Sequence, residues 1–111
     1  KDFIKRVVGV PGDRLCVKDG ALYRNGVRLN EDYIAEPPCY IWPSEDECIV
    51  VPDGYLVVMG DNRNHSNDSH RWGYWDPRTG EWVPQPFLPR ENVLGKAMVI
   101  FWPPHRIRLV H

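Results

Sequence analysis

The sequence predicts a compact, mostly antiparallel β domain, and three observations carry this prediction. The chain has 111 residues, enough for one domain with a modest core. Its eleven prolines and nine glycines separate short apolar segments, which is typical of strands joined by turns. Asp19-Gly20 and Asn25-Gly26 are strong hairpin signals, because both dipeptides tolerate the positive φ angles of tight turns. We therefore expect residues 1–111 to form a single domain.

Apolar or alternating segments bounded by turn residues are the predicted strands. In chain order they cover residues 2–10, 14–18, 21–24, 27–29, 48–51, 55–60, 94–102 and 106–110. Pro11-Gly12 ends the first segment with a turn pair, since Pro presets φ and Gly accepts a positive one.

The remaining segments are predicted to lie outside the main strands. Residues 30–47 are polar and proline-rich, and we expect them to run over the surface. Residues 74–88 are predicted to form an inserted loop or hairpin, and residues 89–93 one helical turn. The insertion is either a tolerated surface loop or an aromatic surface that meets a membrane interface or a partner, given Trp75 and Trp82.

Composition and charge exclude several classes of protein. The net charge is -1 with acidic and basic residues interspersed, which argues against a nucleic-acid binder. No apolar run approaches the roughly 20 residues that cross a bilayer, and no signal-peptide pattern begins the chain. No CxxC or HxxxH spacing indicates a metal site, and no cofactor is expected. Because the chain starts at Lys1 within a predicted strand, we expect a fragment or a processed form.

Three cysteines leave an odd number for pairing. Cys39 and Cys48 bracket a polar loop that a disulfide could close, and such a bridge is worth about 2–3 kcal/mol in the chain-entropy model. Cys16 is expected to be an unpaired thiol within a strand. Three reduced cysteines are an equally acceptable interpretation of the spacing.

Lys5 occupies an apolar strand. It shares a face with Phe3 and Val7, whereas Arg6 lies on the opposite face, so each face carries one cation. One interpretation is an edge strand whose charges reach solvent and discourage aggregation. The other is a general base, because apolar surroundings disfavour the ammonium form of lysine.

The stretch "GDNRNHSNDSHRWG" at residues 60–73 places short polar side chains directly after an apolar strand. Asn, Asp and Ser side chains bond to nearby backbone and hold irregular turns in shape. A structured loop without chemistry is the ordinary interpretation. The stretch also carries two Ser and two Asp at short fixed offsets, followed by Trp72-Gly73. This pattern favours a loop that holds functional groups in position.

This stretch, together with "IKRVVGVPGD" (4–13) and "PRENVLGKAMVIFWP" (89–103), resembles the signature motifs of type I signal peptidases. The motifs occur in the family's order and span nearly the whole chain, and "DSHRWG" looks most like cyanobacterial or plastid members. The resemblance implies a membrane-bound serine endopeptidase that removes signal peptides with a Ser/Lys dyad. It also implies a β-rich fold of the kind shared with LexA-type self-cleaving repressors.

The resemblance also implies roles for individual residues. Lys5 matches the general base and Ser66 the serine whose hydroxyl orients it. Arg6 and Asp61 match an ion pair beside the site, and Asp68 matches a carboxylate that pairs with an arginine. The remaining matches shape the backbone near the site (Gly60, Asn62) or lie on the strand that helps form the substrate pockets (Asp2, Phe3, Ile4). Those pockets accept small residues at the first and third positions before the cut.

The chain also departs from the family pattern. The family's nucleophilic serine precedes the lysine in a Ser-Met-x-Pro-like box after a transmembrane segment, and this chain starts only four residues before Lys5. We therefore expect the chain to be the C-terminal part of the catalytic domain and to be inactive alone. An arginine directly after the second serine is replaced by His70, which leaves either Arg71 or Arg63 as the partner of Asp68.

Loss of strands beside residues 1–9 would leave an unpaired edge, so a dimer or a fusion partner at that edge is expected. The resemblance implies a membrane anchor with the catalytic domain on the extracytoplasmic face, which is periplasmic, extracellular or in the thylakoid lumen. Signal peptides of exported preproteins are then the substrates.

A non-catalytic β-rich binding module is the alternative. Five tryptophans give it weight, with an aromatic surface made by Trp42, Trp72, Trp75 and Trp82. The environment of Lys5 separates the two hypotheses, because an enzyme holds this amine within reach of Ser66 whereas a binding module leaves it solvated. A self-cleaving repressor is disfavoured because such proteins lack a polar box of this kind.

Overall fold

The structure is a computed structural model that describes residues 4–93, 98–101 and 106–109. Its strands are β1 (Ile4–Gly9), β2 (Arg14–Lys18), β3 (Ala21–Arg24), β4 (Val27–Arg28), β5 (Ile49–Val50), β6 (Tyr55–Met59), β7 (Gly73–Trp75), β8 (Trp82–Pro84), β9 (Leu88–Pro89), β10 (Met98–Phe101) and β11 (Arg106–Leu109). Two short 3-10 helices complete the described elements: η1 (Arg63–His65) and η2 (Arg90–Val93).

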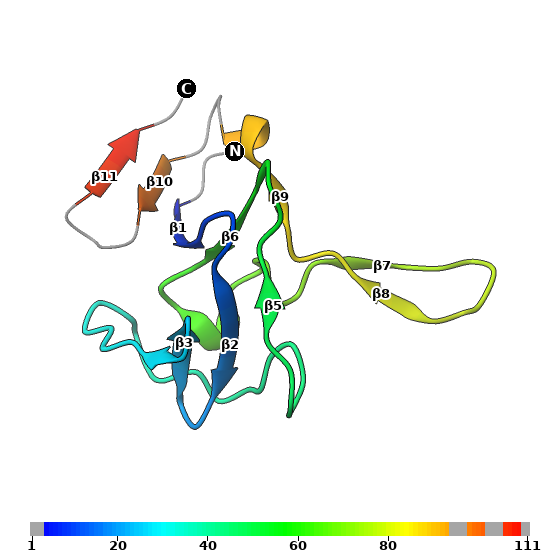
Figure 1. The fold of residues 1–111 in the computed structure, drawn as a ribbon, viewed down its shortest axis with the longest axis horizontal. Helices are drawn as coiled ribbons and strands as arrows, with labels where there is room; N and C mark the ends of the chain where they lie inside the picture. Colours follow the sequence, from blue (N-terminus) through cyan, green and yellow to red (C-terminus); the bar gives the residue numbers. More distant parts are fainter. Residues whose placement is uncertain (1–3, 94–97, 102–105, 110–111) are drawn as a thin grey trace.

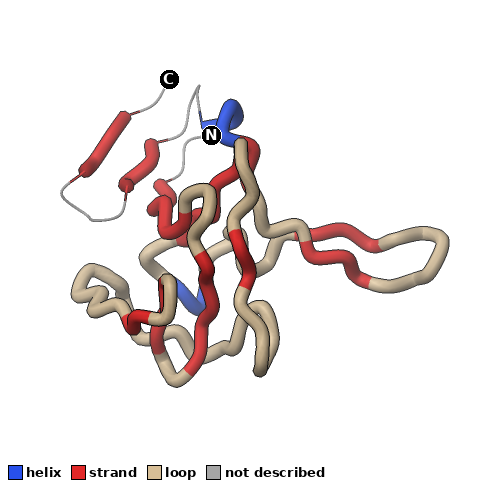
Figure 2. The backbone as a smooth tube through the Cα atoms, viewed as in Figure 1, coloured by secondary structure: helices blue, strands red, loops and turns tan. Residues whose placement is uncertain are grey.

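The described strands form three sheets (Figure 1). One has the order β11-β10-β1-β6-β9, the second has the order β4-β3-β2-β5, and β7 pairs with β8 alone. All pairings are antiparallel except that of β1 with β10. The mostly antiparallel β fold predicted from the sequence is confirmed, and long loops connect its short strands (Figure 2).

The strand β1 lies inside its sheet rather than at an edge. It pairs with β10 on one side and with β6 on the other. The interpretation of Lys5 as an edge-strand charge is therefore wrong, and so is the open edge on which the expected dimer or fusion contact depended. The sequence pattern missed the parallel partner because β10 lies about 90 residues further along the chain.

The faces of this sheet carry two apolar clusters. Val8, Val57 and Met59 join the larger cluster, which reaches β2 and β3 through Leu15 and Leu22. The smaller cluster consists of Val7, Leu56 and Val58, with Trp72 and Leu88 packed against it. Neighbouring residues thus alternate between faces, as the sequence predicts for a strand. Burial on both faces fixes the register of β1, which carries Lys5, and of β6, which Gly60 follows.

The two hairpin turns form where the dipeptides predicted them. Asp19 and Asn25 both adopt positive φ (51° and 54°), as do the glycines that follow them. Within the predicted insertion, β7 and β8 form a hairpin that projects away from the body of the domain (Figure 1). Whether this hairpin is an insertion relative to the family stays a prediction.

Candidate active site

Lys5 and Ser66 meet although they lie 61 positions apart in the sequence. Lys5 Nζ donates a hydrogen bond of 2.7 Å to Ser66 Oγ. Ser66 follows η1 and is only 7% exposed, and Lys5 is half-buried on β1. An amine held against a hydroxyl in this partly dry setting is the arrangement expected of a general base with its orienting partner.

Gly60 makes this contact possible. It follows β6, and a Cβ at this position would lie 2.2 Å from Ser66 Oγ and 3.5 Å from Lys5 Nζ. Because a real Cβ never approaches another atom to 2.2 Å, only glycine lets the serine hydroxyl sit against the end of the strand. The sequence assigned Gly60 a role in shaping the backbone, and the structure places it directly over the Lys5–Ser66 pair.

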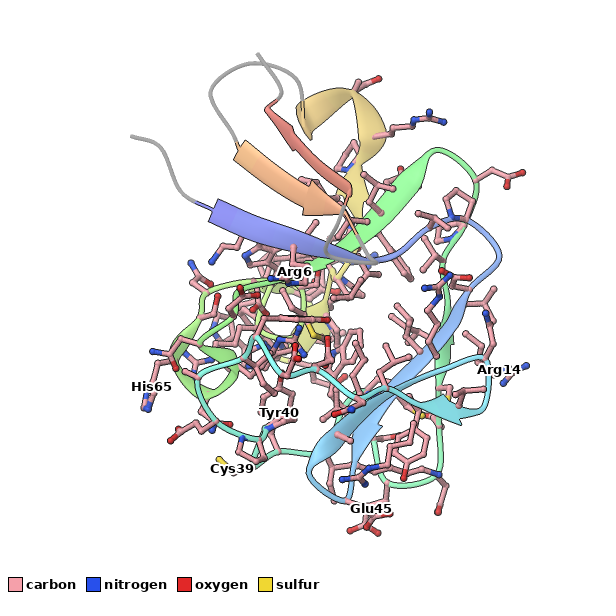
Figure 3. The ribbon with its side chains drawn as sticks, turned by 90° about the vertical axis from the view of Figure 1, so that its left-hand side faces the viewer. Arg6, Arg14, Cys39, Tyr40, Glu45 and His65 are labelled. Carbon is pink, nitrogen blue, oxygen red and sulfur yellow. The ribbon has the colours of Figure 1, made fainter. Side chains whose placement is uncertain are left out.

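Arg6 takes the opposite face of β1 from Lys5. Its Nε and Nη2 each donate a 2.8 Å hydrogen bond to one carboxylate oxygen of Asp61. The Arg6 guanidinium also lies over the ring of Tyr33, with Cζ 3.4 Å from the ring centroid. Figure 3 shows the Arg6 side chain directed into the molecule. This bidentate pair and stack fix the residue that follows Gly60.

Arg63 and Glu31 form a second ion pair that the sequence did not predict. The Arg63 side chain is fully buried and Glu31 is 3% exposed, and two hydrogen bonds of 2.6 and 2.9 Å join them. Burial alone would lower the pKa of Arg63, but the hydrogen bonds and charge of Glu31 raise it above its ordinary value. Arg63 Nε donates to the carbonyl of Gly60 at 3.0 Å, so the pair holds the backbone that covers Ser66.

Tyr33 connects the two ion pairs. Its hydroxyl donates a 2.5 Å hydrogen bond to Glu31 Oε2, while its ring stacks on Arg6. Burial, followed by the hydrogen bond to Glu31, raises the pKa of the Tyr33 hydroxyl. The loop that carries Glu31 and Tyr33 was predicted only to run over the surface. It instead supplies partners to Arg63 and Arg6.

Asp68 pairs with a histidine rather than an arginine. Its Oδ1 bonds to Nδ1 of His70 and accepts the His70 amide at 3.1 Å, and its Oδ2 accepts the amide of Gly60 at 2.8 Å. Burial alone would raise the pKa of Asp68, but these bonds from His70 and Gly60 lower it below its ordinary range. Both arginines proposed as partners are engaged elsewhere, Arg63 with Glu31 and Arg71 with the carbonyl of Asn64.

The imidazole of His70 is held on its flat face as well. The ring of Tyr40 stacks on it, with centroids 4.1 Å apart and planes 6° from parallel. Burial raises the pKa of Tyr40, to which the charge of Asp68 adds. His65, in contrast, is exposed and points away from the domain (Figure 3). The two histidines of the polar stretch therefore differ in their surroundings.

Other polar side chains of residues 60–73 bond to backbone. Ser69 Oγ accepts the amide of Val58 at 2.9 Å, and the Ser69 amide bonds the carbonyl of the same residue at 3.1 Å. Asn64 bonds the backbone of Cys39 at 2.7 Å and of Pro37 at 3.1 Å. Asn62 caps η1 without a side-chain hydrogen bond.

The predicted substrate strand is described only in part. Asp2 and Phe3 lie outside the described residues, and Ile4 begins β1 opposite Met98. Within the described ranges, no group of three or more His, Cys, Asp or Glu side chains is arranged to hold a metal ion. The same ranges contain no helix with the length and apolar character needed to span a membrane.

The structure distinguishes between the alternatives left open for the cysteines and the tryptophans. Cys16, Cys39 and Cys48 are all free thiols, which matches the interpretation of three reduced cysteines and not a Cys39–Cys48 bridge. Trp42 is buried in the core, whereas Trp75 and Trp82 are 67% and 44% exposed on the hairpin. The four tryptophans proposed as one aromatic surface therefore do not form it, because Trp42 packs with the core valines and leucines.

Comparisons with known proteins identify the relatives of this chain. The family model described as "Signal peptidase, peptidase S26" matches residues 1–102. The chain belongs to this family. Probable signal peptidase I-2 of Synechocystis sp. is 46% identical over 108 residues, which cover 97% of this chain and 42% of that protein. Thylakoidal processing peptidase 1 of Arabidopsis thaliana is 41% identical over 105 residues, covering 95% of this chain and 26% of that protein.

A solved structure supports the family assignment independently. A crystal structure of a signal peptidase I from Enterococcus faecalis matches with a TM-score of 0.58 and 26% identity, covering 96% of this chain and 80% of that chain. The chain spans less than half the length of the cyanobacterial relatives it matches. The family predicted from the three motifs is confirmed.

Proposed function

We propose that residues 1–111 form the C-terminal part of a signal peptidase catalytic domain in which Lys5 is the general base. The observation that carries this proposal is the 2.7 Å hydrogen bond between Lys5 Nζ and Ser66 Oγ. The ion pairs of Asp61 with Arg6 and of Arg63 with Glu31 support the same site. They fix the backbone next to Gly60, to whose carbonyl Arg63 also donates.

The chemistry follows from the position of the amine. In its neutral form, Lys5 takes the proton from the hydroxyl of a nucleophilic serine as that oxygen attacks the scissile carbonyl. Backbone and hydroxyl donors stabilise the developing oxyanion, and the lysine then gives its proton to the leaving amine. In the second step, Lys5 takes a proton from water, which hydrolyses the acyl-enzyme. Ser66 keeps the amine aimed at the reacting oxygen throughout.

The nucleophile is assigned to a serine that precedes Lys5 in the full-length protein. The chain has three serines, at positions 44, 66 and 69. Ser69 is 1% exposed and its hydroxyl is bonded to the amide of Val58, while Ser44 bonds Glu47 on an exposed turn. Ser66 contacts the lysine but is 7% exposed beneath Gly60, which suits an orienting hydroxyl better than one that attacks a peptide.

The family and its named relatives support the substrates and location. Signal peptides of exported preproteins are the proposed substrates, with small residues at the first and third positions before the cut. The full-length protein is proposed to be anchored in a membrane with this domain on the extracytoplasmic face. Relatives named signal peptidase I in cyanobacteria and a thylakoidal processing peptidase in a plant are consistent with this location.

A membrane-contacting role is proposed for the hairpin of β7 and β8. Tyr74 and Trp75 are 53% and 67% exposed there, and the Trp75 and Trp82 rings meet edge to face at 5.5 Å. Gly73 permits the close approach of this hairpin, since a Cβ there would lie 2.6 Å from the Trp82 ring. Exposed tryptophan and tyrosine side chains are favoured at the interface between lipid and water.

The test is cleavage of a preprotein by the full-length protein and its variants. Lys5→Ala should lower kcat by at least about a hundredfold, the range of a lost general base. Lys18→Ala is the matched control, because Lys18 is exposed on β2, and it should cleave at the wild-type rate. Cleavage by Lys5→Ala within tenfold of wild type would refute the proposal.

The role of Ser66 needs its own comparison. Ser66→Ala should retain measurable cleavage if the hydroxyl only orients the lysine, and Ser44→Ala should have no effect. Mass analysis of a trapped acyl-enzyme should place the acyl group on a serine outside residues 1–111. An acyl group found on Ser66 would overturn the assignment of its role while leaving the enzyme class intact.

A further inference from the structure

Cys16 lies on β2, and Cys48 is the residue immediately before the neighbouring strand β5. β2 pairs antiparallel with β5, with Arg14 opposite Val50 and Leu15 opposite Ile49. One step further along this register places Cys48 opposite Cys16, and their side chains then share one face. The Cys48 side chain lies close enough to Cys16 to contribute to the raised pKa of the Cys16 thiol. Local sequence pattern does not reveal this pair, because 31 residues separate the two cysteines.

The backbone pattern shows which kind of cross-strand pair this is. On the same edge of β2, Val17 and Trp42 exchange two backbone hydrogen bonds, of 2.7 and 3.0 Å. The backbone N–H and C=O groups of successive residues point to opposite sides of a strand. Those of Cys16 therefore point toward β3 and form no hydrogen bond with the backbone of Cys48. Opposite residues of this non-hydrogen-bonded class have Cα atoms about 4.5 Å apart. That spacing falls within the roughly 4.4–6.8 Å that a disulfide spans.

We propose that Cys16 and Cys48 form a cross-strand disulfide when the protein meets an oxidising thiol–disulfide partner. The proposal is independent of the peptidase function. Cys39 is excluded as the partner of Cys48 for two reasons. Cys39 lies on an exposed segment held by Asn64, and the register of β2 with β5 places Cys16 next to Cys48.

The reaction proceeds by thiol–disulfide exchange with a small disulfide such as oxidised glutathione. Cys48 is half-exposed, so its sulfur attacks first, forming a mixed disulfide and releasing one reduced thiol. The Cys16 sulfur then attacks the Cys48 sulfur, which forms the cross-strand bond and releases the second thiol. Two protons leave the protein and its two thiols lose two electrons, which reduce the small disulfide to two thiols.

Burial governs the speed of the second step. It raises the pKa of the Cys16 thiol to about 11, and the nearby Cys48 side chain contributes to the rise. Since the thiolate is the attacking species, closure of the bridge should be slow at neutral pH. Its rate should rise with pH, because a larger fraction of the Cys16 side chain is then in the thiolate form.

The bridge would act on the candidate active site through the loop that it closes. That loop contains Glu31 and Tyr33, the partners of Arg63 and Arg6. Constraining roughly 30 residues in the unfolded chain raises the folding equilibrium constant by several hundredfold in the loop-entropy model. We expect a rise in Tm of roughly 15 °C on oxidation.

The experiment oxidises the purified, reduced chain with oxidised glutathione and maps its disulfides by peptide mass spectrometry. A crosslinked pair of peptides containing positions 16 and 48 is expected, together with the rise in Tm. Cys39→Ala is the matched control and should give the same crosslink and the same rise. Cys48→Ala and Cys16→Ala should each abolish the crosslink and the rise in Tm. Of the two, Cys48→Ala disturbs the fold less, because Cys48 is half-exposed whereas Cys16 is buried.

Three results would overturn the proposal. The first is a crosslink that joins Cys39 to either of the other cysteines. The second is a stable glutathione adduct on Cys48 that does not resolve at pH 9, although Cys16 stays reduced. The third is loss of the crosslink in Cys39→Ala.

Discussion

Replacing Glu31 by glutamine tests whether the loop that carries it supports the site. In the wild-type chain each Glu31 oxygen accepts a hydrogen bond from Arg63, and Oε2 also accepts the Tyr33 hydroxyl. Glutamine has the same shape but offers one oxygen and no charge. At least one Arg63 donor therefore loses its acceptor, and the guanidinium keeps an uncompensated charge in a fully buried position.

The size of the effect follows from that burial. Removing one partner of a buried ion pair costs about 3–5 kcal/mol, because the remaining charge stays desolvated. A domain of this size has roughly 5–15 kcal/mol of stability, so the variant should remain folded but much weakened. Glu36→Gln is the matched control. Glu36 lies on the same loop and bonds Asn64 of the same polar stretch, but it is exposed and should cost under about 1 kcal/mol.

The assay is urea unfolding followed by tryptophan fluorescence at pH 7, with a double-mutant cycle. Glu31→Gln and Arg63→Gln should each destabilise the chain, and the double variant should lose at least 2 kcal/mol less than the sum of the two. An additive double variant, or a Glu31→Gln variant no less stable than Glu36→Gln, would refute the idea that this buried pair holds the site.

Three further predictions concern single residues. Gly60→Ala should lower the free energy of unfolding by about 1–3 kcal/mol and reduce cleavage at least tenfold in the full-length protein, because its Cβ would lie 2.2 Å from Ser66 Oγ; an unchanged rate would contradict the packing. Asp68→Asn should cost about 1–3 kcal/mol at pH 7. Because the pKa of Asp68 is lower in the folded chain, its contribution exists above pH 4 or so and is lost as the pH falls through the folded value, so the difference from wild type in urea unfolding should shrink in acid. Trp75→Ala should remove most of the fluorescence blue shift that phosphatidylcholine vesicles cause, and an equal shift in wild type and variant would exclude the hairpin as the contact.

Local pattern was enough to predict most of the strands. The turns at Asp19-Gly20 and Asn25-Gly26 could be predicted because each depends on two adjacent residues that tolerate positive φ angles. Alternation along β1 placed Lys5 and Arg6 on opposite faces for the same reason. The strand β9 escaped prediction because two residues ending in proline carry too little pattern to identify a strand.

Long-range partners were beyond the reach of local pattern. Glu31 looked like any charge in a polar loop, and nothing near it in sequence shows that Arg63 is buried. Asp68 was expected to pair with an arginine. His70, only two residues away, contacts the same carboxylate instead, and at this separation no long side chain is needed. The partner of Cys48 is set by the register of β2 against β5, which depends on packing of the whole domain.

The polar stretch makes physical sense once its hydrogen bonds are traced. Gly60 is held at both backbone groups, its amide by Asp68 and its carbonyl by Arg63, and both bonds are buried. A glycine is otherwise the most mobile residue in a chain, so both restraints are needed to keep it over Ser66. Arg6, bonded to Asp61, restrains the next residue from the neighbouring strand. The short polar side chains therefore stabilise one backbone position, and that position keeps the serine hydroxyl against the lysine amine.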